Sequence, residues 1–218
     1  MKKRQIHNLI ILDESGSMES IKSQVVSGFN ETVQTIKGSQ KLFPEQEQFI
    51  TVVSFNGLGN KLLHYNDEVK NLQQLNAHLY NPDAMTPLFD AIGFAINKMK
   101  KVLKDEKDFN VLVTIFTDGE ENASKEYTGN QVKIMIEKLK NENWTFTYIG
   151  TDHDVEKIAI NLSITNTLSF EKDSEGISEM FVKERNARNN YYKKVSLDEE
   201  TNSNYFDERD HSEQKLRP

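Results

Sequence analysis

Four short runs rich in Ile, Val, Thr or Phe are spread along the chain, and each is bounded by polar or turn residues. The runs cover residues 5–12, 49–55, 110–117 and 145–150. The first three are almost continuously apolar rather than alternating, which is typical of strands covered on both faces. This feature limits the fold more than any other, because a parallel sheet buried on both faces needs a helical layer on each side.

Between these runs, apolar residues recur at every third or fourth position, which places them on one side of a helix. The three sets are Ile21, Val25, Phe29, Val33 and Ile36, then Phe89, Ile92, Ile96, Met99 and Leu103, then Val132, Met135, Ile136 and Leu139. Weaker patterns predict a short strand at 61–65, a helix at 155–160, a strand at 167–170 and a helix at 174–191. The alternation predicts an α/β fold with a doubly wound, mostly parallel central sheet flanked by helices.

The length of 218 residues suits one domain followed by a tail. From Ser196 onward apolar residues almost vanish and acidic residues become frequent. Such a segment cannot bury enough apolar surface to order itself. The sequence therefore predicts one domain over residues 1–195 and an acidic, disordered tail over residues 196–218.

The charge balance excludes some classes of partner. With 27 basic and 34 acidic residues the net charge is −7, so the surface lacks the positive field that nucleic acids and anionic membranes require. The absence of cysteine rules out disulfides, thiol nucleophiles and thiolate metal sites. The apolar run at 9–12 is too short for a signal peptide, and no stretch approaches the ~20 apolar residues of a membrane span. We expect a cytoplasmic protein with neither a nucleic-acid nor a membrane partner.

Polar side chains follow the first and third apolar runs, where strands of a parallel sheet would end. Asp13, Ser15 and Ser17 follow the first run, Asp118 follows the third, and Thr86 precedes the helix expected at 89–103. In open α/β sheets, ligands bind at the carboxyl ends of the strands near the point where the strand order reverses. If the first and third runs are neighbours there, these side chains open into one crevice.

Two carboxylates and three hydroxyls form an oxygen-rich set that suits a hard divalent cation such as Mg²⁺. Every second side chain of Asp13-x-Ser15-x-Ser17 can point the same way, and Gly16 lets the backbone pass close to the ion. Two carboxylates only neutralise the ion, so it stays electrophilic. An acidic group from another molecule could fill an open position and make the metal a bridge between two proteins.

These residues resemble the metal-ion-dependent adhesion site of von Willebrand factor type A domains, in which Asp-x-Ser-x-Ser is followed by a distant Thr and a distant Asp. The resemblance implies that the hydroxyls ligate Mg²⁺ or Mn²⁺, that the aspartates bind it directly or through water, and that an Asp or Glu of a partner protein completes the shell. It implies no catalytic role. The implied metal ligands are Asp13, Ser15, Ser17, Thr86 and Asp118.

The resemblance extends over residues 5–190, and the segment 86–91 is similar to the stretch around the family's threonine. Without cysteines or a leader, the chain looks more like stand-alone bacterial intracellular members than like secreted adhesion proteins. Some of these intracellular members work in assemblies with kinases, phosphatases or chaperone-like ATPases. Extending such assemblies to this chain rests on analogy alone. In some members the last helix shifts when a ligand binds, and here that helix would be 174–191.

Other roles are open for the hydroxyl residues. Ser15 or Ser17 could cap the first helix, since Ser is a favoured N-cap. Thr86 could likewise be an N-cap, with Pro87 at the first helical position.

The nearby acidic residues also have alternative roles. Glu14, Glu120 and Glu121 are expected on an exposed rim, where they would only modulate the local field. Asp152 or Asp154 is expected to cap the helix at 155–160.

The alternative function is a Mg²⁺-dependent phosphohydrolase with Asp13 as nucleophile. Phosphatases of the haloacid-dehalogenase type need a second Asp two residues later, and Ser15 stands there. The sequence also lacks a phosphate-binding loop, a His-Glu-x-x-His pair and a Gly-x-Ser-x-Gly elbow. We therefore expect a binding module and no enzyme, and a metal-free scaffold stays open as a third possibility.

Overall fold

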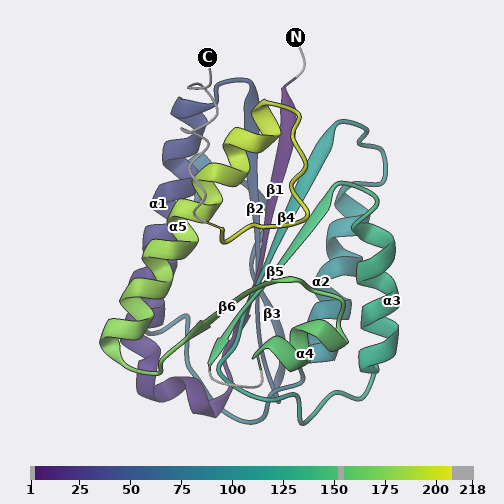
Figure 1. Cartoon of the computed structure of the whole chain (residues 1–218). Helices are drawn as coiled ribbons and strands as arrows, with labels where there is room; N and C mark the ends of the chain where they lie inside the picture. The colour runs from purple at the N-terminus through teal and green to yellow at the C-terminus, as the bar shows by residue number, and fades with distance from the viewer. Residues whose placement is uncertain (1–2, 152–154, 208–218) are drawn as a thin grey trace, which may run out of the picture.

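The computed structural model describes residues 3–151 and 155–207. Strands and helices alternate along the chain as the sequence predicts (Figure 1). The strands are β1 (Arg4–Asp13), β2 (Gln46–Asn56), β3 (Gly59–Glu68), β4 (Phe109–Phe116), β5 (Trp144–Thr151) and β6 (Asn166–Phe170). The α-helices are α1 (Lys22–Leu42), α2 (Leu88–Val102), α3 (Gly129–Leu139), α4 (Val155–Asn161) and α5 (Ser174–Ser196), and short 3-10 helices cover Gly16–Ile21 and Val69–Asn71.

The six strands form one sheet in the order β3-β2-β1-β4-β5-β6. All neighbours are parallel except β3, which runs antiparallel to β2 at one edge. The order reverses at β1, which lies between β2 and β4, and Leu12 of β1 pairs with Phe116 of β4. The predicted doubly wound, mostly parallel sheet is therefore confirmed, and β1 and β4 end side by side at its switch point.

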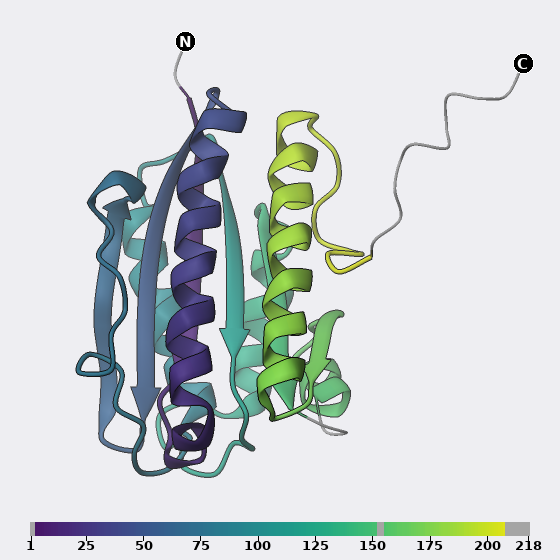
Figure 2. The ribbon, with the colours of Figure 1, turned by 90° about the vertical axis from the view of Figure 1, so that its left-hand side faces the viewer.

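Helices cover both faces of the sheet, which explains why the strands read as continuous apolar runs. On β1, Leu9 and Ile11 pack into the cluster formed with α2, α3 and α4. Their neighbours Ile10 and Leu12 point the other way, into the cluster formed with α1 and α5. Figure 2 shows α1 and α5 side by side on that second face. Successive side chains of a strand alternate between the faces, so β1 is buried on both sides.

The predicted elements are all present, with different bounds. The strand expected at 61–65 is longer, because β3 is a half-exposed edge strand in which polar residues mask the apolar pattern. Helix α4 begins at Val155, and its expected cap, Asp152 or Asp154, lies outside the described residues. No helix in the described ranges combines the length and the apolar character that crossing a membrane would need.

The prediction of a disordered tail from residue 196 is wrong for residues 196–207, and Ser196 is the last residue of α5. Thr201 and Tyr205 are buried, and Tyr205 joins a cluster with Ile6 and Leu112 of the sheet. The segment also uses backbone groups, since the Tyr205 N–H donates to Asn166 Oδ1 at 3.1 Å. Two well-placed side chains dock a segment whose average composition is polar. Residues 208–218 lie outside the described part of the chain.

Candidate metal centre

Asp13 is the last residue of β1, and its carboxylate is buried and held in place. The Ser15 N–H donates to Oδ1 at 2.7 Å, and the Thr117 hydroxyl donates to Oδ2 at 2.5 Å. Thr117 directly follows β4, so the pairing of β1 with β4 creates the second contact. Burial raises the pKa of the Asp13 carboxyl to about 6, and the hydrogen bonds from Thr117 and Ser15 oppose that rise. A bound cation would stabilise the charged form in the same way.

Ser15 and Ser17 connect Asp13 to Asp118, since the Ser15 N–H bonds Asp13 and the two hydroxyls continue the link. Ser15 Oγ lies 3.2 Å from Ser17 Oγ, and Ser17 Oγ donates to Asp118 Oδ1 at 2.6 Å. The Asp118 carboxylate is 0% exposed, although it stands at the protein surface where β4 ends. Residues that lie 101 positions apart in the chain therefore share one site.

Thr86 reaches the same place from the segment before α2. A Cβ atom on Gly119 would lie 3.2 Å from Thr86 Oγ1 and 3.5 Å from Ser17 Oγ. Only a glycine leaves this space open, so Gly119 keeps the two hydroxyls on either side of a small cradle. The structure thus brings together all five residues that the sequence proposes as ligands.

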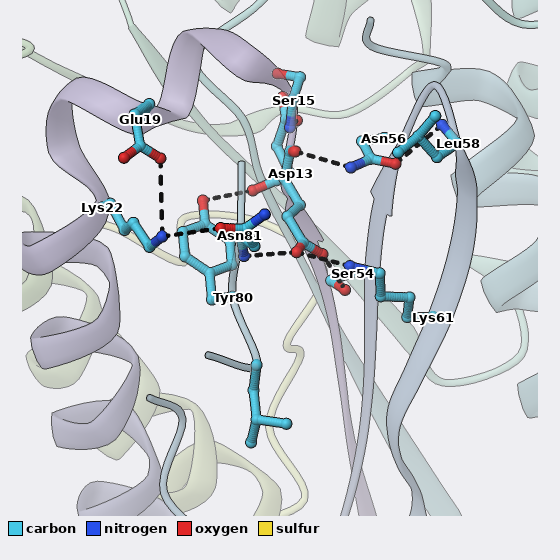
Figure 3. Close-up of polar contacts among 12 residues, drawn as sticks. Asp13, Ser15, Glu19, Lys22, Ser54, Asn56, Leu58, Lys61, Tyr80 and Asn81 are labelled. Carbon is cyan, nitrogen blue, oxygen red and sulfur yellow. Dashed lines mark hydrogen bonds and ion pairs between the residues drawn. The ribbon is translucent and has the colours of Figure 1, made fainter. Parts of the chain in front are cut away.

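Backbone contacts hold the loop after β1 against the segment that carries Thr86. The Gly16 N–H donates to the Ala84 carbonyl at 3.0 Å, and the Asp83 N–H donates to the Glu14 carbonyl at 2.9 Å. The Tyr80 hydroxyl donates to the Asp13 carbonyl at 2.7 Å (Figure 3). These bonds fix the distance between two parts of the site that no secondary-structure element connects.

The capping interpretation is wrong for Ser15 and Thr86. Ser15 stands at the N-cap position of the 3-10 helix Gly16–Ile21, but within the described chain its side chain makes no capping hydrogen bond. Helix α2 begins at Leu88 with Pro87 at the N-cap, one residue later than a Thr86 cap requires. Neither hydroxyl is used as a helix cap, so both are available to the crevice.

The expectation that Glu14 lies on an exposed rim is also wrong. Its side chain is 0% exposed, and it accepts hydrogen bonds from Ser54 Oγ at 2.7 Å, Lys61 Nζ at 2.8 Å and Asn81 N at 2.6 Å. Figure 3 shows these three partners converging from β2, β3 and the segment beside Tyr80. The charge of Glu14 is balanced by Lys61, so this carboxylate organises the loop rather than the crevice.

The two acidic residues after Asp118 differ from each other. Glu120 is exposed, as expected. Glu121 is half-buried and accepts from the Phe89 N–H at 2.9 Å and from the Ser124 hydroxyl at 2.6 Å. Glu121 therefore ties the loop after β4 to the start of α2, which helps to position Thr86.

Sequence reasoning missed two residues of the site. Thr117 orients Asp13, and its place at a strand end next to Asp118 is a signal that could have found it. Lys172 lies in the connection between β6 and α5, where Nζ donates to the Ser17 carbonyl at 2.7 Å and lies 2.5 Å from Asp118 Oδ2. No spacing or apolar pattern marks Lys172, because only the fold brings it to this edge of the sheet.

The donor set fits a hard divalent cation. Among residues 3–151 and 155–207, no group of three or more His, Cys, Asp or Glu side chains gathers. The crevice instead offers two carboxylates and three hydroxyls. Asp118 Oδ2 is buried and accepts no hydrogen bond of normal geometry from the described residues, and its contact there is the ion pair with Lys172 Nζ at 2.5 Å. A cation could coordinate this oxygen in place of the ammonium. All the donors are oxygen atoms, the type that Mg²⁺ and Mn²⁺ prefer.

Fold and crevice together define an α/β domain with a hydroxyl-rich, oxygen-only crevice, a candidate cation site, at the switch point of a doubly wound sheet. The chain belongs to the von Willebrand factor type A domain family, whose family model matches residues 9–181. No curated protein sequence matches the chain.

Solved structures show the same fold. A von Willebrand factor type A protein from Catenulispora acidiphila has a TM-score of 0.55 and 14% identity, over 84% of this chain and 42% of that one. The SpRpn10 VWA domain has a TM-score of 0.54 and 15% identity, over 83% and 94%. The pilus adhesin SpaC from Lactobacillus rhamnosus GG, in its open conformation, has a TM-score of 0.59 and 14% identity, over 88% and 31%. The chain thus spans less than half of the Catenulispora protein and of the adhesin, and the likeness concerns the fold.

Proposed function

We propose that this protein is a binding module in which Mg²⁺ or Mn²⁺ captures an acidic side chain of a partner protein. Domains of this family commonly mediate protein–protein interaction. The observation that carries the proposal is the 2.6 Å contact between Ser17 Oγ and Asp118 Oδ1, which unites the two halves of the ligand set. The proposed ligands are Asp13, Ser15, Ser17, Thr86 and Asp118.

The charges around the crevice support a metal that keeps affinity for an outside carboxylate. Asp13 and Asp118 together formally neutralise a divalent ion, and Glu14 is already paired with Lys61. The hydroxyls contribute dipoles without charge. The ion would therefore accept one more anionic ligand, and a partner's Asp or Glu supplies it with a charge-assisted bond.

The alternative function, a phosphohydrolase with Asp13 as nucleophile, has less support. Both carboxylate oxygens of Asp13 are engaged, by the Ser15 N–H and by the Thr117 hydroxyl, and the side chain is buried. A nucleophile needs a free oxygen that can approach phosphorus in line. These contacts favour a fixed metal ligand, direct or through water, over a nucleophile, so we propose no enzymatic activity. The cytoplasmic location and the bacterial source both stay predictions from the sequence.

Metal-linked stability tests the site directly. Mn²⁺ at roughly 100 times its Kd would stabilise the folded chain by about 2.7 kcal/mol and raise the Tm by several degrees. We expect Ser15→Ala and Asp118→Asn to lose most of this gain, and the exposed Ser23→Ala in α1 to retain it. Thermal unfolding with Mn²⁺ and with a chelator measures the difference. If Mn²⁺ raised the Tm equally in the wild type and in all three variants, Ser15 and Asp118 would not be metal ligands.

Partner capture tests the function that the site would serve. Immobilised protein should retain its partner from a lysate of the native cell in Mn²⁺, lose it in chelator and recover it when Mn²⁺ returns. Asp118→Asn protein should retain none under any condition. If the partner were retained equally with and without chelator, the metal would not bridge the two proteins, whatever the stability data show.

A further inference from the structure

Lys172 places a positive charge on two residues of the proposed metal site. Its Nζ atom donates to the Ser17 carbonyl at 2.7 Å and lies 2.5 Å from Asp118 Oδ2. The other Asp118 oxygen, Oδ1, already accepts from Ser17 Oγ at 2.6 Å. The ammonium therefore takes the one Asp118 oxygen that a cation would use.

The burial of the two partners is unequal. The Asp118 side chain is 0% exposed, whereas the Lys172 side chain is 33% exposed. A buried carboxylate needs a counter-charge, and here the ammonium supplies it. A divalent cation bound to Asp118 would supply the same counter-charge more strongly and would repel an ammonium held this close. The ammonium and the divalent cation therefore cannot both bind Asp118 Oδ2 closely at the same time.

The backbone on both sides of Lys172 is fixed while its side chain has a path to solvent. Phe170 is buried and stacks on Phe116 with ring centroids 5.4 Å apart. Asp173 caps α5, because its Oδ1 accepts from the Gly176 N–H at 2.8 Å. Lys172 is thus tethered beside the crevice, and its flexible stem lets the ammonium leave without any change in the strands.

We propose that Lys172 is a built-in competitor of the metal: its ammonium and the divalent cation bind Asp118 in alternation. The inference rests on the metal site of the proposed function. It adds that competition with Lys172 determines how much metal the site binds. Mg²⁺ or Mn²⁺ must displace Lys172, so the site has a lower metal affinity than its five ligands would give alone. The residue keeps Asp118 neutralised whenever the metal is absent.

Direct Mn²⁺ titration of the full chain, followed by the EPR signal of free Mn²⁺, tests the competition. Lys172→Met keeps the length of the stem and removes the charge. We expect roughly tenfold tighter Mn²⁺ binding in this variant, the order of one lost charge-assisted hydrogen bond. The matched control is Lys22→Met at the start of α1, whose ammonium bonds Asn81 and touches none of the proposed ligands. We expect the control to bind Mn²⁺ as the wild type does.

The outcomes separate the competition from the metal site itself. Equal Mn²⁺ affinity in wild type and Lys172→Met, with no binding by Asp118→Asn, would overturn the competition and leave the site intact. An equal gain in Lys172→Met and Lys22→Met would overturn it too, because the effect would then be general electrostatics. Tighter Mn²⁺ binding in Lys172→Met than in both the wild type and Lys22→Met would support the competition. Absence of binding in every protein would overturn both the site and the inference.

Stability without metal gives a second readout. In chelator, Lys172→Met should lower the Tm, because Asp118 loses its counter-charge. In saturating Mn²⁺ the variant and the wild type should unfold at the same temperature. A variant destabilised equally in both conditions would mean that Lys172 only supports the structure, which contradicts the proposal.

Discussion

At the scale of single residues, two adjacent carboxylates at the end of β1 have different tasks. Asp13 faces the crevice and is oriented by Ser15 and Thr117. Glu14 faces away, and Lys61 neutralises it. The difference follows from the alternation of side chains along an extended chain, which sends neighbours to opposite sides. Both groups are fully buried, so each requires its own compensation.

His7, in the middle of β1, predicts how stability depends on pH. Its ring is buried and stacks on Phe49 with ring centroids 5.1 Å apart. Nδ1 lies 3.1 Å from Asn66 Oδ1 and Nε2 lies 3.2 Å from Gln5 Oε1, and the neutral ring donates from only one of these nitrogens. Burial lowers the pKa of His7 from 6.5 to about 4. Between these values the unfolded chain takes up a proton that the folded chain does not. The contribution of His7 is therefore complete above pH 6.5 and is lost as the pH falls to about 4, by about 3 kcal/mol at most.

Urea unfolding at near-neutral pH and at acidic pH within this window measures the effect. His7→Gln should lose less stability on acidification than the wild type, because the titrating ring is absent. His78→Gln, which changes an exposed histidine, should behave as the wild type does. If His7→Gln lost as much as the wild type, another group would control the acid side of the stability curve.

At the scale of elements, α1 and α5 approach closely at one glycine. A Cβ atom on Gly28 would lie 2.0 Å from the Phe181 ring, and that ring stacks against Phe116 with centroids 5.8 Å apart. The ring cannot withdraw without losing this packing. We expect Gly28→Ala to lower the free energy of unfolding by about 1–3 kcal/mol, the usual cost of overpacking.

The same helix offers the matched control. Gly38 has no atom within 4 Å of where its Cβ would lie. Gly38→Ala should therefore stabilise the protein by about 0.5–1 kcal/mol, because alanine loses less conformational entropy in a helix. Chemical denaturation of the two variants should give opposite signs. Stabilisation by Gly28→Ala would contradict the close contact between α1 and α5.

At the scale of the whole molecule, a buried polar network fixes α5 on the sheet. Arg188 is 0% exposed, donates to Asn8 Oδ1 and to Thr114 Oγ1 at 2.8 Å each, and pairs with Glu184 at 2.6 Å. The Tyr205 hydroxyl donates to the same Glu184 at 3.3 Å. The network spans β1, β4, α5 and the segment 197–207, so it defines the register of the last helix.

Tyr205 predicts that the C-terminal segment contributes to the stability of the domain. Tyr205→Ala should cost about 3 kcal/mol, the usual cost of removing a buried aromatic ring. Tyr205→Phe should cost about 1 kcal/mol, because only the long hydrogen bond to Glu184 is lost. Urea midpoints with unchanged m-values would measure both. An unaffected Tyr205→Ala protein would mean that residues 197–207 are not part of the folded domain.

The sequence by itself determined the fold class, and it predicted which residues meet at the candidate site. The apolar runs and helical spacings are local patterns, and they predict secondary structure because each element places its apolar side chains on the side that becomes buried. Once the strands are parallel, their carboxyl ends share one edge. Asp13 and Asp118 meet on the condition that the first and third runs are neighbours, and the structure meets this condition by pairing β1 with β4.

Only the tertiary structure decided how the charges around the site are balanced. Glu14 is buried because Lys61 of β3 reaches it, and Lys172 meets Ser17 across 155 positions of the chain. Tyr205 turns a polar segment into part of the core. No local pattern carries this information, because the energy of a buried charge or ring depends on neighbours that the chain supplies only after it has folded.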